Sequence, residues 1–203
     1  MDKHYKISRF GVFADKSMEQ GFQANMVSRY SKSSAFVALI FGFLFILFLG
    51  NDYEAVTNNS SIMIITITRM LFLIVSAAVF FMIRRTLKHT TLIYILTAYA
   101  AITAISYLII LQQYDVLTYL SVLGLVVTTL AIYILPNKVL FTLLISVIMS
   151  ILFFLFPAQK IEGLEQGNVY QVAAYQIIVL IHCTTSAHLT NLYKRKQYAA
   201  NAK

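Results

Sequence analysis

Apolar residues along this chain are gathered into six long runs with polar breaks between them. The runs cover residues 34–49, 62–83, 92–111, 117–135, 139–156 and 170–192. An α-helix needs about 20 apolar residues to cross roughly 30 Å of hydrocarbon, and these runs are close to that length. They do not alternate apolar with polar residues, as the strands of a membrane barrel would. The pattern therefore predicts an all-α integral membrane protein with six transmembrane helices.

The polar segment ahead of the first run, residues 1–33, predicts one short helix. Asp15 can cap its first turn, because a carboxylate accepts the free N–H groups there. Apolar residues then recur every four positions, which places them on one face of the helix. They are Met18, Phe22, Met26 and Tyr30. We interpret the segment as an amphipathic helix on the inner membrane surface, and docking onto a cytoplasmic partner domain is the alternative.

The last apolar run continues into residues 193–203 without a helix-breaking residue. No Gly or Pro occurs from Leu189 to Lys203, and the Ala, Lys, Arg and Gln residues there favour helix. The sixth helix is therefore expected to leave the membrane as a rigid rod. The chain divides into the N-terminal segment 1–33, a six-span domain over 34–192, and the start of a signalling helix over 193–203.

Composition and charge give the predicted helices an orientation. The 203 residues are 59% hydrophobic and 12% charged, whereas a soluble domain carries about 25% charged residues. The net charge of +8 does not indicate nucleic-acid binding, because the basic residues flank the apolar runs. With the N-terminus inside, fourteen of the 16 Lys and Arg residues face the cytoplasm, and only Lys160 faces outward. Since Lys and Arg gather on the cytoplasmic side, both termini are predicted to be cytoplasmic.

The sequence holds no motif that indicates an enzyme. It lacks a phosphate-binding glycine loop and the usual zinc-protease and serine-hydrolase motifs, and no Asp or Glu lies within a predicted span. We therefore expect no catalytic residues and no cofactor. A metal is not expected either, because His182 and His188 lie roughly 240° apart around one helix. Cys183 is the only cysteine, so no intrachain disulfide can form.

Arg69 is the one basic residue inside a predicted span, where a guanidinium group is costly unless it is paired or hydrated. It could reach the outer headgroups, pair with an outer acid, or bind the anionic group of a ligand. The outer acids within reach are Asp52, Glu54 and Asp115. Polar residues are expected at a similar depth on other helices: Tyr107, Ser121, Ser150, Tyr175 and Gln176. The sequence thus predicts an outward-facing pocket for a small amphipathic or anionic ligand, lined by Arg69 and these five residues.

The inner half of the sixth run is unusually polar, from His182 to Asn191. Such a face is expected to avoid lipid and to contact other helices, which would explain the two histidines; His182 could also sense pH. One partner for the face is the same helix of a second copy, because most homo-oligomers are two-fold dimers. His182, Thr185 and Leu189 share one side of the helix, so we expect a homodimer through these residues.

A short motif near the N-terminus resembles bacterial signalling proteins. It reads F-x-D-x-x-x-E-x-x-F, formed by Phe13, Asp15, Glu19 and Phe22, and the first span closes on Asp52. The pattern is similar to the start of six-span sensor domains of the MASE-like kind, which precede GGDEF diguanylate cyclase or class III adenylyl cyclase domains. The residues 193–198, Y-K-R-K-Q-Y, resemble the exit of those domains into a signalling helix. The resemblance implies a bacterial inner-membrane sensor, and no position here matches the catalytic residues of a cyclase.

Two functions are consistent with these sequence features. The first is a sensor or receptor module that binds a small ligand in the outward-facing pocket and signals through the last helix to a cytoplasmic cyclase-type domain. The second is a small six-span transporter or channel. Transporters often show two matching halves with broken helices, and no convincing repeat of that kind is visible in this sequence.

Overall fold

The structure is a computed structural model that describes residues 6–8, 12–117, 119–160 and 166–201. Within these ranges nearly every residue is helical, and the one strand-like feature is an isolated bridge between Ile7 and Phe13. The helices are α1 (Lys16–Leu47), α2 (Leu49–Ala55), α3 (Asn59–Arg85), α4 (His89–Gln113), α5 (Tyr119–Ile134), α6 (Val139–Leu155), the 3-10 turn η1 (Pro157–Lys160) and α7 (Gln166–Asn201).

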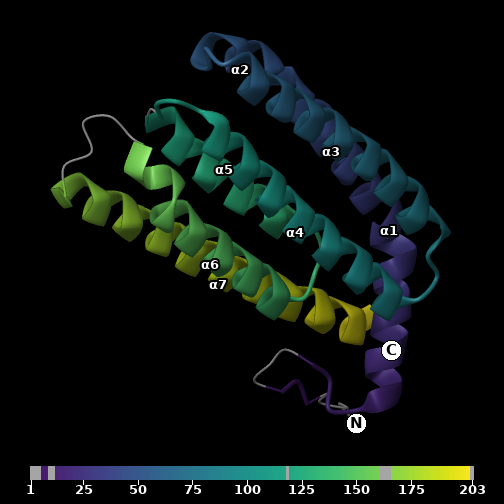
Figure 1. Cartoon of the computed structure of the whole chain (residues 1–203). Helices are drawn as coiled ribbons and strands as arrows, with labels where there is room; N and C mark the ends of the chain where they lie inside the picture. The colour runs from purple at the N-terminus through teal and green to yellow at the C-terminus, as the bar shows by residue number, and fades with distance from the viewer. Residues whose placement is uncertain (1–5, 9–11, 118, 161–165, 202–203) are drawn as a thin grey trace.

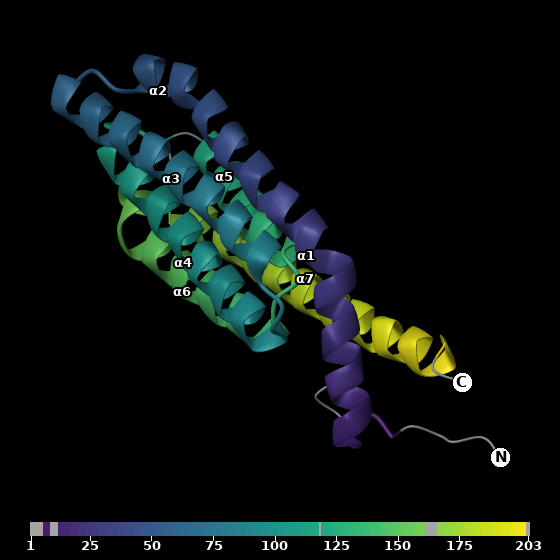
Figure 2. The same ribbon diagram turned by 90° about the vertical axis from the view of Figure 1, so that its right-hand side faces the viewer.

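The long helices lie side by side as an elongated bundle (Figure 1). Helix α3 packs between α1 and α4, and α4 contacts α6, while α5 and α6 both pack against α7. The start of α1 and the end of α7 project past the other helices at the same end of the bundle (Figure 2). We name this the terminal end, and we name the opposite end, where α2 and the start of α3 lie, the far end.

The helices have the apolar character expected of a protein embedded in a membrane. In the described chain, α1, α3, α4 and α7 are each long and apolar enough to cross a bilayer. Large apolar side chains such as Ile74 and Leu140 point away from the bundle with more than 60% of their surface exposed. The prediction of an apolar all-α fold is confirmed, whereas the number of spans and their orientation remain predictions.

The fourth and fifth predicted spans correspond to shorter helices than the others. Helix α5 has 16 residues and α6 has 17, or about 24 and 26 Å at 1.5 Å per residue. Pro136 separates them, and Pro157 follows α6 and begins the turn η1. Proline lacks the N–H that would continue a helix, which explains why α6 ends where it does.

The N-terminal helix differs from the expectation of a short, separate element. Its cap is confirmed, because the Asp15 carboxylate accepts the N–H groups of Ser17 at 2.8 Å and Met18 at 3.3 Å. The helix does not end near Tyr30, however, but continues without a break to Leu47. The helix continues through the polar residues 31–34, where the Ser34 hydroxyl donates to the Tyr30 carbonyl at 2.6 Å. Such bonds can bend a helix, and α1 changes direction partway along (Figure 2).

Small residues let α1 and α3 approach each other closely. A Cβ atom added at Gly42 would lie 2.6 Å from the Ser76 Cβ, closer than side chains can pack. The Ser76 hydroxyl shares a hydrogen bond of 2.9 Å with the Tyr99 hydroxyl, which donates to the Ala38 carbonyl at 2.8 Å. These buried polar groups therefore join α1, α3 and α4 at the point where the helices come closest.

Candidate functional site

An ion pair joins the two ends of the chain at the terminal end of the bundle. The Arg195 guanidinium, near the end of α7, donates to the Glu19 carboxylate in the first turn of α1, with Nη2 2.8 Å from Oε1. Its Nε lies 3.3 Å from Oε2, so the contact is bidentate. The remaining nitrogen of the guanidinium, Nη1, donates to the side-chain oxygen of Asn191. Because Arg195 is buried, this pair is more protected from solvent than an ordinary surface salt bridge.

Aromatic rings surround this ion pair. The guanidinium of Arg195 lies 4.2 Å from the centre of the Phe22 ring, and that ring meets Tyr198 edge-on at 5.7 Å. The Phe13 ring is 6.0 Å from Phe22. We name the five residues Phe13, Glu19, Phe22, Arg195 and Tyr198 the terminal clasp.

Hydrogen bonds decide the charge state of Glu19, which lies in the polar segment before the first apolar run. Burial acts to raise the pKa of its carboxyl group, but hydrogen bonds from Arg195, Gln23 and the Phe13 N–H act in the opposite direction. The net effect holds the pKa of Glu19 below its ordinary value. Glu19 is therefore ionised at neutral pH, and the clasp contains a full ion pair.

The clasp gives each residue of the N-terminal motif a structural role. Asp15 caps α1, Glu19 binds Arg195, and Phe13 and Phe22 pack against Tyr198. The motif therefore contacts the exit segment 193–198, a pairing that the sequence analysis did not anticipate. The one available signal was the acid at position 19 together with the basic run at 194–196, which is too general to select a partner 176 residues away.

Arg69 is buried at the far end, where it binds the side chain of Asp52. Both Nε and Nη2 donate to the carboxylate, the latter at 2.8 Å, and Nη1 donates to the Phe45 carbonyl. The Tyr114 hydroxyl donates to the same carboxylate. Pairing with an outer acid was one of the roles expected of Arg69, and it is present. Ligand binding by Arg69 stays a prediction, and an anionic ligand would have to compete with Asp52.

Two other predicted site residues, Ser150 and Gln176, are in contact inside the bundle. The Gln176 side chain on α7 donates to the Ser150 hydroxyl on α6 and to the Thr129 hydroxyl on α5, each at 2.9 Å. All three residues are buried. In the described part of the chain, neither the Gln176 Oε1 nor the nearby Ser146 hydroxyl has a hydrogen-bond partner. Gln176 and Ser150 are therefore in direct contact, whereas the predicted outward-facing pocket stays a prediction.

The remaining predicted pocket residues lie apart from this cluster. Tyr107 is buried on α4 and faces Gly124, where an added Cβ would lie 3.1 Å from its hydroxyl oxygen. Tyr175 is 54% exposed, and its hydroxyl accepts a hydrogen bond from Gln171. Ser121 belongs to α5, but its side chain lies outside the described residues. The structure therefore unites Ser150 with Gln176 but does not gather all six predicted residues at one place.

One face of α7 is left uncovered by the rest of the described chain. The predicted dimer residues His182, Thr185 and Leu189 are all exposed, as are Tyr193 and Lys196 further along the same side. The opposite side is covered, with Cys183 buried and the Thr184 hydroxyl 2.7 Å from the Tyr133 hydroxyl. The polar inner half of this helix therefore only partly contacts its own bundle.

Comparison with models of known protein families, with curated proteins and with solved structures finds no match to this chain. Among the described residues, no group of three or more His, Cys, Asp or Glu side chains is placed to hold a metal ion.

Proposed function

We propose that the chain is a membrane sensor module that signals through α7 to a cytoplasmic domain of the cyclase type. In this proposal the chain crosses the bacterial inner membrane six times and both termini are cytoplasmic. The observation that carries it is the length of α7, whose 36 residues span about 54 Å. The hydrocarbon core is about 30 Å thick, so roughly 24 Å of helix lies beyond it, and residues 193–201 on the exit side account for about 13 Å of that length. The clasp fixes this projecting segment to the start of α1.

The uncovered face of α7 supports signalling by a homodimer. A stripe through His182, Thr185 and Leu189 could pack against the same stripe of a second copy, as in a two-fold interface. Two parallel α7 helices would then hold two output domains side by side. A small rotation or shift of these helices, produced by ligand binding in the bundle, would change the distance and orientation of the output domains.

The ligand in this proposal is a small amphipathic or anionic molecule that enters from the far end. Gln176 is the residue that links it most directly to the output, because it belongs to α7 and its buried Oε1 has no hydrogen-bond partner among the described residues. A ligand that donates a hydrogen bond to this oxygen would act on α7 itself. Arg69 and Ser150 remain candidate ligand residues on the neighbouring helices.

The alternative function, a small six-span transporter or channel, is favoured by one observation. Gln176, Ser150, Thr129 and Ser146 form a polar cluster inside an apolar bundle, and intramembrane polar groups often lie on a substrate pathway. A transporter would have little use for a helix that extends past the bundle and is clasped to α1. The sensor is therefore the better-supported function.

Alanine insertions after Asn201 would test whether α7 transmits a signal as a rigid helix. The full chain is fused there to a diguanylate cyclase domain, which requires two copies in register, and product is measured in cells. Each inserted alanine turns the fused domain by about 100°. We expect activity to change severalfold with helical periodicity, so that four insertions, about 400°, resemble none and two insertions differ most. The substrate nucleotide is cytoplasmic, so activity also requires a cytoplasmic C-terminus.

The matched control is a series of fusions that carry flexible Gly-Ser linkers of the same lengths. A flexible linker does not conserve rotation, so this series should show no periodicity. Equal activity for all alanine insertions, as in the control series, would contradict transmission through α7 and favour the transporter.

A further inference from the structure

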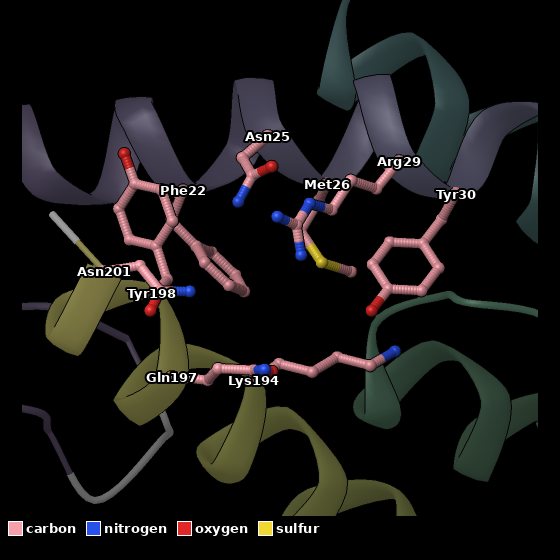
Figure 3. A pocket seen from close by; sticks show the side chains of 9 residues that line it. All are labelled: Phe22, Asn25, Met26, Arg29, Tyr30, Lys194, Gln197, Tyr198 and Asn201. Atoms are coloured by element: carbon pink, nitrogen blue, oxygen red, sulfur yellow. The ribbon is translucent and has the colours of Figure 1, made fainter.

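A cavity of about 330 Å³ lies beside the terminal clasp, between the first half of α1 and the end of α7. Figure 3 shows side chains from the two helices pointing toward each other across this space. Its lining residues on α1 are Phe22, Asn25, Met26, Arg29 and Tyr30, and those on α7 are Lys194, Gln197, Tyr198 and Asn201. Its size falls at the lower end of the range typical of small-molecule sites. The cavity takes no part in the sensing mechanism proposed above.

The lining of the cavity is cationic and rich in hydrogen-bond donors. Arg29 and Lys194 contribute two positive charges, and none of the described residues that line the space is acidic. In the described part of the chain neither of them forms an ion pair with a carboxylate, because the nearby Glu19 is bound to Arg195. The amides of Asn25, Gln197 and Asn201 add neutral donors. Unpaired cations surrounded by amide donors are the groups that bind a phosphate.

Aromatic side chains lie at both ends of the same cavity, with Phe22 and Tyr198 at one end and Tyr30 at the other (Figure 3). The Lys194 ammonium lies 4.1 Å from the centre of the Tyr30 ring. Asn201 follows Lys194 by seven positions, so the cavity extends about 10 Å along α7. The headgroup region on one side of a bilayer is roughly 5 to 8 Å thick. In the proposed orientation, Tyr30 and Lys194 lie at the inner interface, and the cavity opens at the depth of the lipid phosphates.

We propose that this cavity binds a phosphate-bearing anion, either the headgroup of an anionic lipid or a soluble phosphate ester. Arg29 and Lys194 bind the phosphate oxygens, the three amides donate further hydrogen bonds, and Phe22, Tyr30 and Tyr198 contact the carbon atoms next to the phosphate. The proposal depends on the proposed orientation only for the choice between the two sources. The cavity itself is a property of the packing of α1 against α7.

Occupancy of the cavity would strengthen the contact between α1 and the signalling helix. An anion held by Arg29 from α1 and Lys194 from α7 adds a second bridge beside the bridge from Glu19 to Arg195. Because Tyr198 belongs to both the clasp and the cavity lining, the two sites are coupled by direct contact. This deepens the proposed function, since a ligand on the cytoplasmic side would then set the position of α7.

The test compares two double variants of the full chain that remove the same charges. R29Q/K194Q removes the cavity cations, and K32Q/K196Q removes two exposed cations on the same helices that do not line the cavity. Native mass spectrometry in detergent measures how much phosphatidylglycerol the protein retains compared with phosphatidylcholine as each lipid is titrated. Glycerol 3-phosphate is titrated by calorimetry in phosphatidylcholine nanodiscs. A third variant, N25F, keeps both cations but fills the cavity.

We expect the wild-type chain to bind one of the two probes and R29Q/K194Q to bind it roughly 20-fold more weakly. N25F should lose binding to a similar extent. K32Q/K196Q should stay within about threefold of the wild type, because neither side chain lines the cavity and salt screens charges that do not contact the anion. Preference for phosphatidylglycerol identifies a lipid source, and binding of glycerol 3-phosphate identifies a soluble one. No binding of either probe, or equal losses in the two double variants, would overturn the proposal.

Failure of this proposal can be told apart from failure of the proposed function. Disulfide crosslinking between the α7 helices of two copies tests the proposed dimer, and its outcome does not depend on either probe. A chain that crosslinks through α7 but binds neither probe would keep the sensor mechanism and lose the anion site. A chain that binds a probe but does not crosslink would keep the anion site and lose the dimer.

Discussion

Replacing Asp52 with leucine should lower the free energy of unfolding by about 3–5 kcal/mol, the typical cost of leaving one buried charge without its partner. Among the described residues, the variant leaves the buried Arg69 guanidinium without an anionic partner, beside the Phe45 carbonyl and ring. Arginine does not lose its proton in proteins, so the charge cannot be removed by titration. The double variant D52L/R69L should recover most of the loss, because two apolar side chains can replace a buried ion pair.

The two single variants should differ in severity. R69L leaves the Asp52 carboxylate with the Tyr114 hydroxyl, and an unpaired buried carboxylate can take up a proton and become neutral. We therefore expect R69L to be less destabilised than D52L. Thermal unfolding in mild detergent measures both. The matched control is D115L, which removes an exposed acid at the same end that accepts hydrogen bonds from Thr57. Equal stability of D52L and D115L would contradict the structure of this site.

Replacing Gly42 with alanine should lower the free energy of unfolding by about 1–3 kcal/mol, the usual cost of overpacking a core. The new Cβ would be 2.6 Å from the Ser76 Cβ and 2.8 Å from its hydroxyl oxygen, so α1 and α3 must separate. The separation would also stretch the hydrogen bond from Tyr99 to Ala38. This loss exceeds the helix propensity that alanine gains over glycine, at most about 1 kcal/mol.

Gly50 provides the control for this prediction. It also lies within a helix, but nothing is within 4 Å of an added Cβ. G50A should therefore be neutral or more stable by up to about 1 kcal/mol, because only helix propensity changes. Chemical or thermal unfolding of both variants gives the comparison. A G42A protein as stable as G50A would show that α1 and α3 do not pack as closely as described.

Part of this arrangement could be predicted from the sequence, because it depends on local chemistry. The lengths of the apolar runs predicted an apolar all-α fold, and the carboxylate at Asp15 predicted the helix cap. The cost of a buried guanidinium likewise made pairing with Asp52, Glu54 or Asp115 one of the roles expected of Arg69. Each of these inferences needs only the residue and its neighbours in sequence or depth.

Other features depend on distances and directions that no local pattern contains. The stripe from Met18 to Tyr30 predicts a covered face, but it does not tell whether lipid, a partner or the chain's own α7 covers it. Helix depth placed Arg69, Tyr175 and Gln176 at one level, but depth does not fix the direction in which each side chain points around its helix. Tyr175 and Gln176 are adjacent in sequence, yet one is exposed and the other is buried.

The central claim, that α7 pairs with its own copy and carries the signal, is tested most directly by disulfide crosslinking in native membranes. Single cysteines are placed from position 182 to position 200 in a C183A background, and dimers are measured after mild oxidation. We expect crosslinking to peak near positions 182, 185, 189 and 196, on the uncovered face, and to be weak near 184, 191 and 195, which face the chain's own bundle. A flat profile, or a profile strongest near 184, 191 and 195, would contradict the dimer and return the transporter to first place.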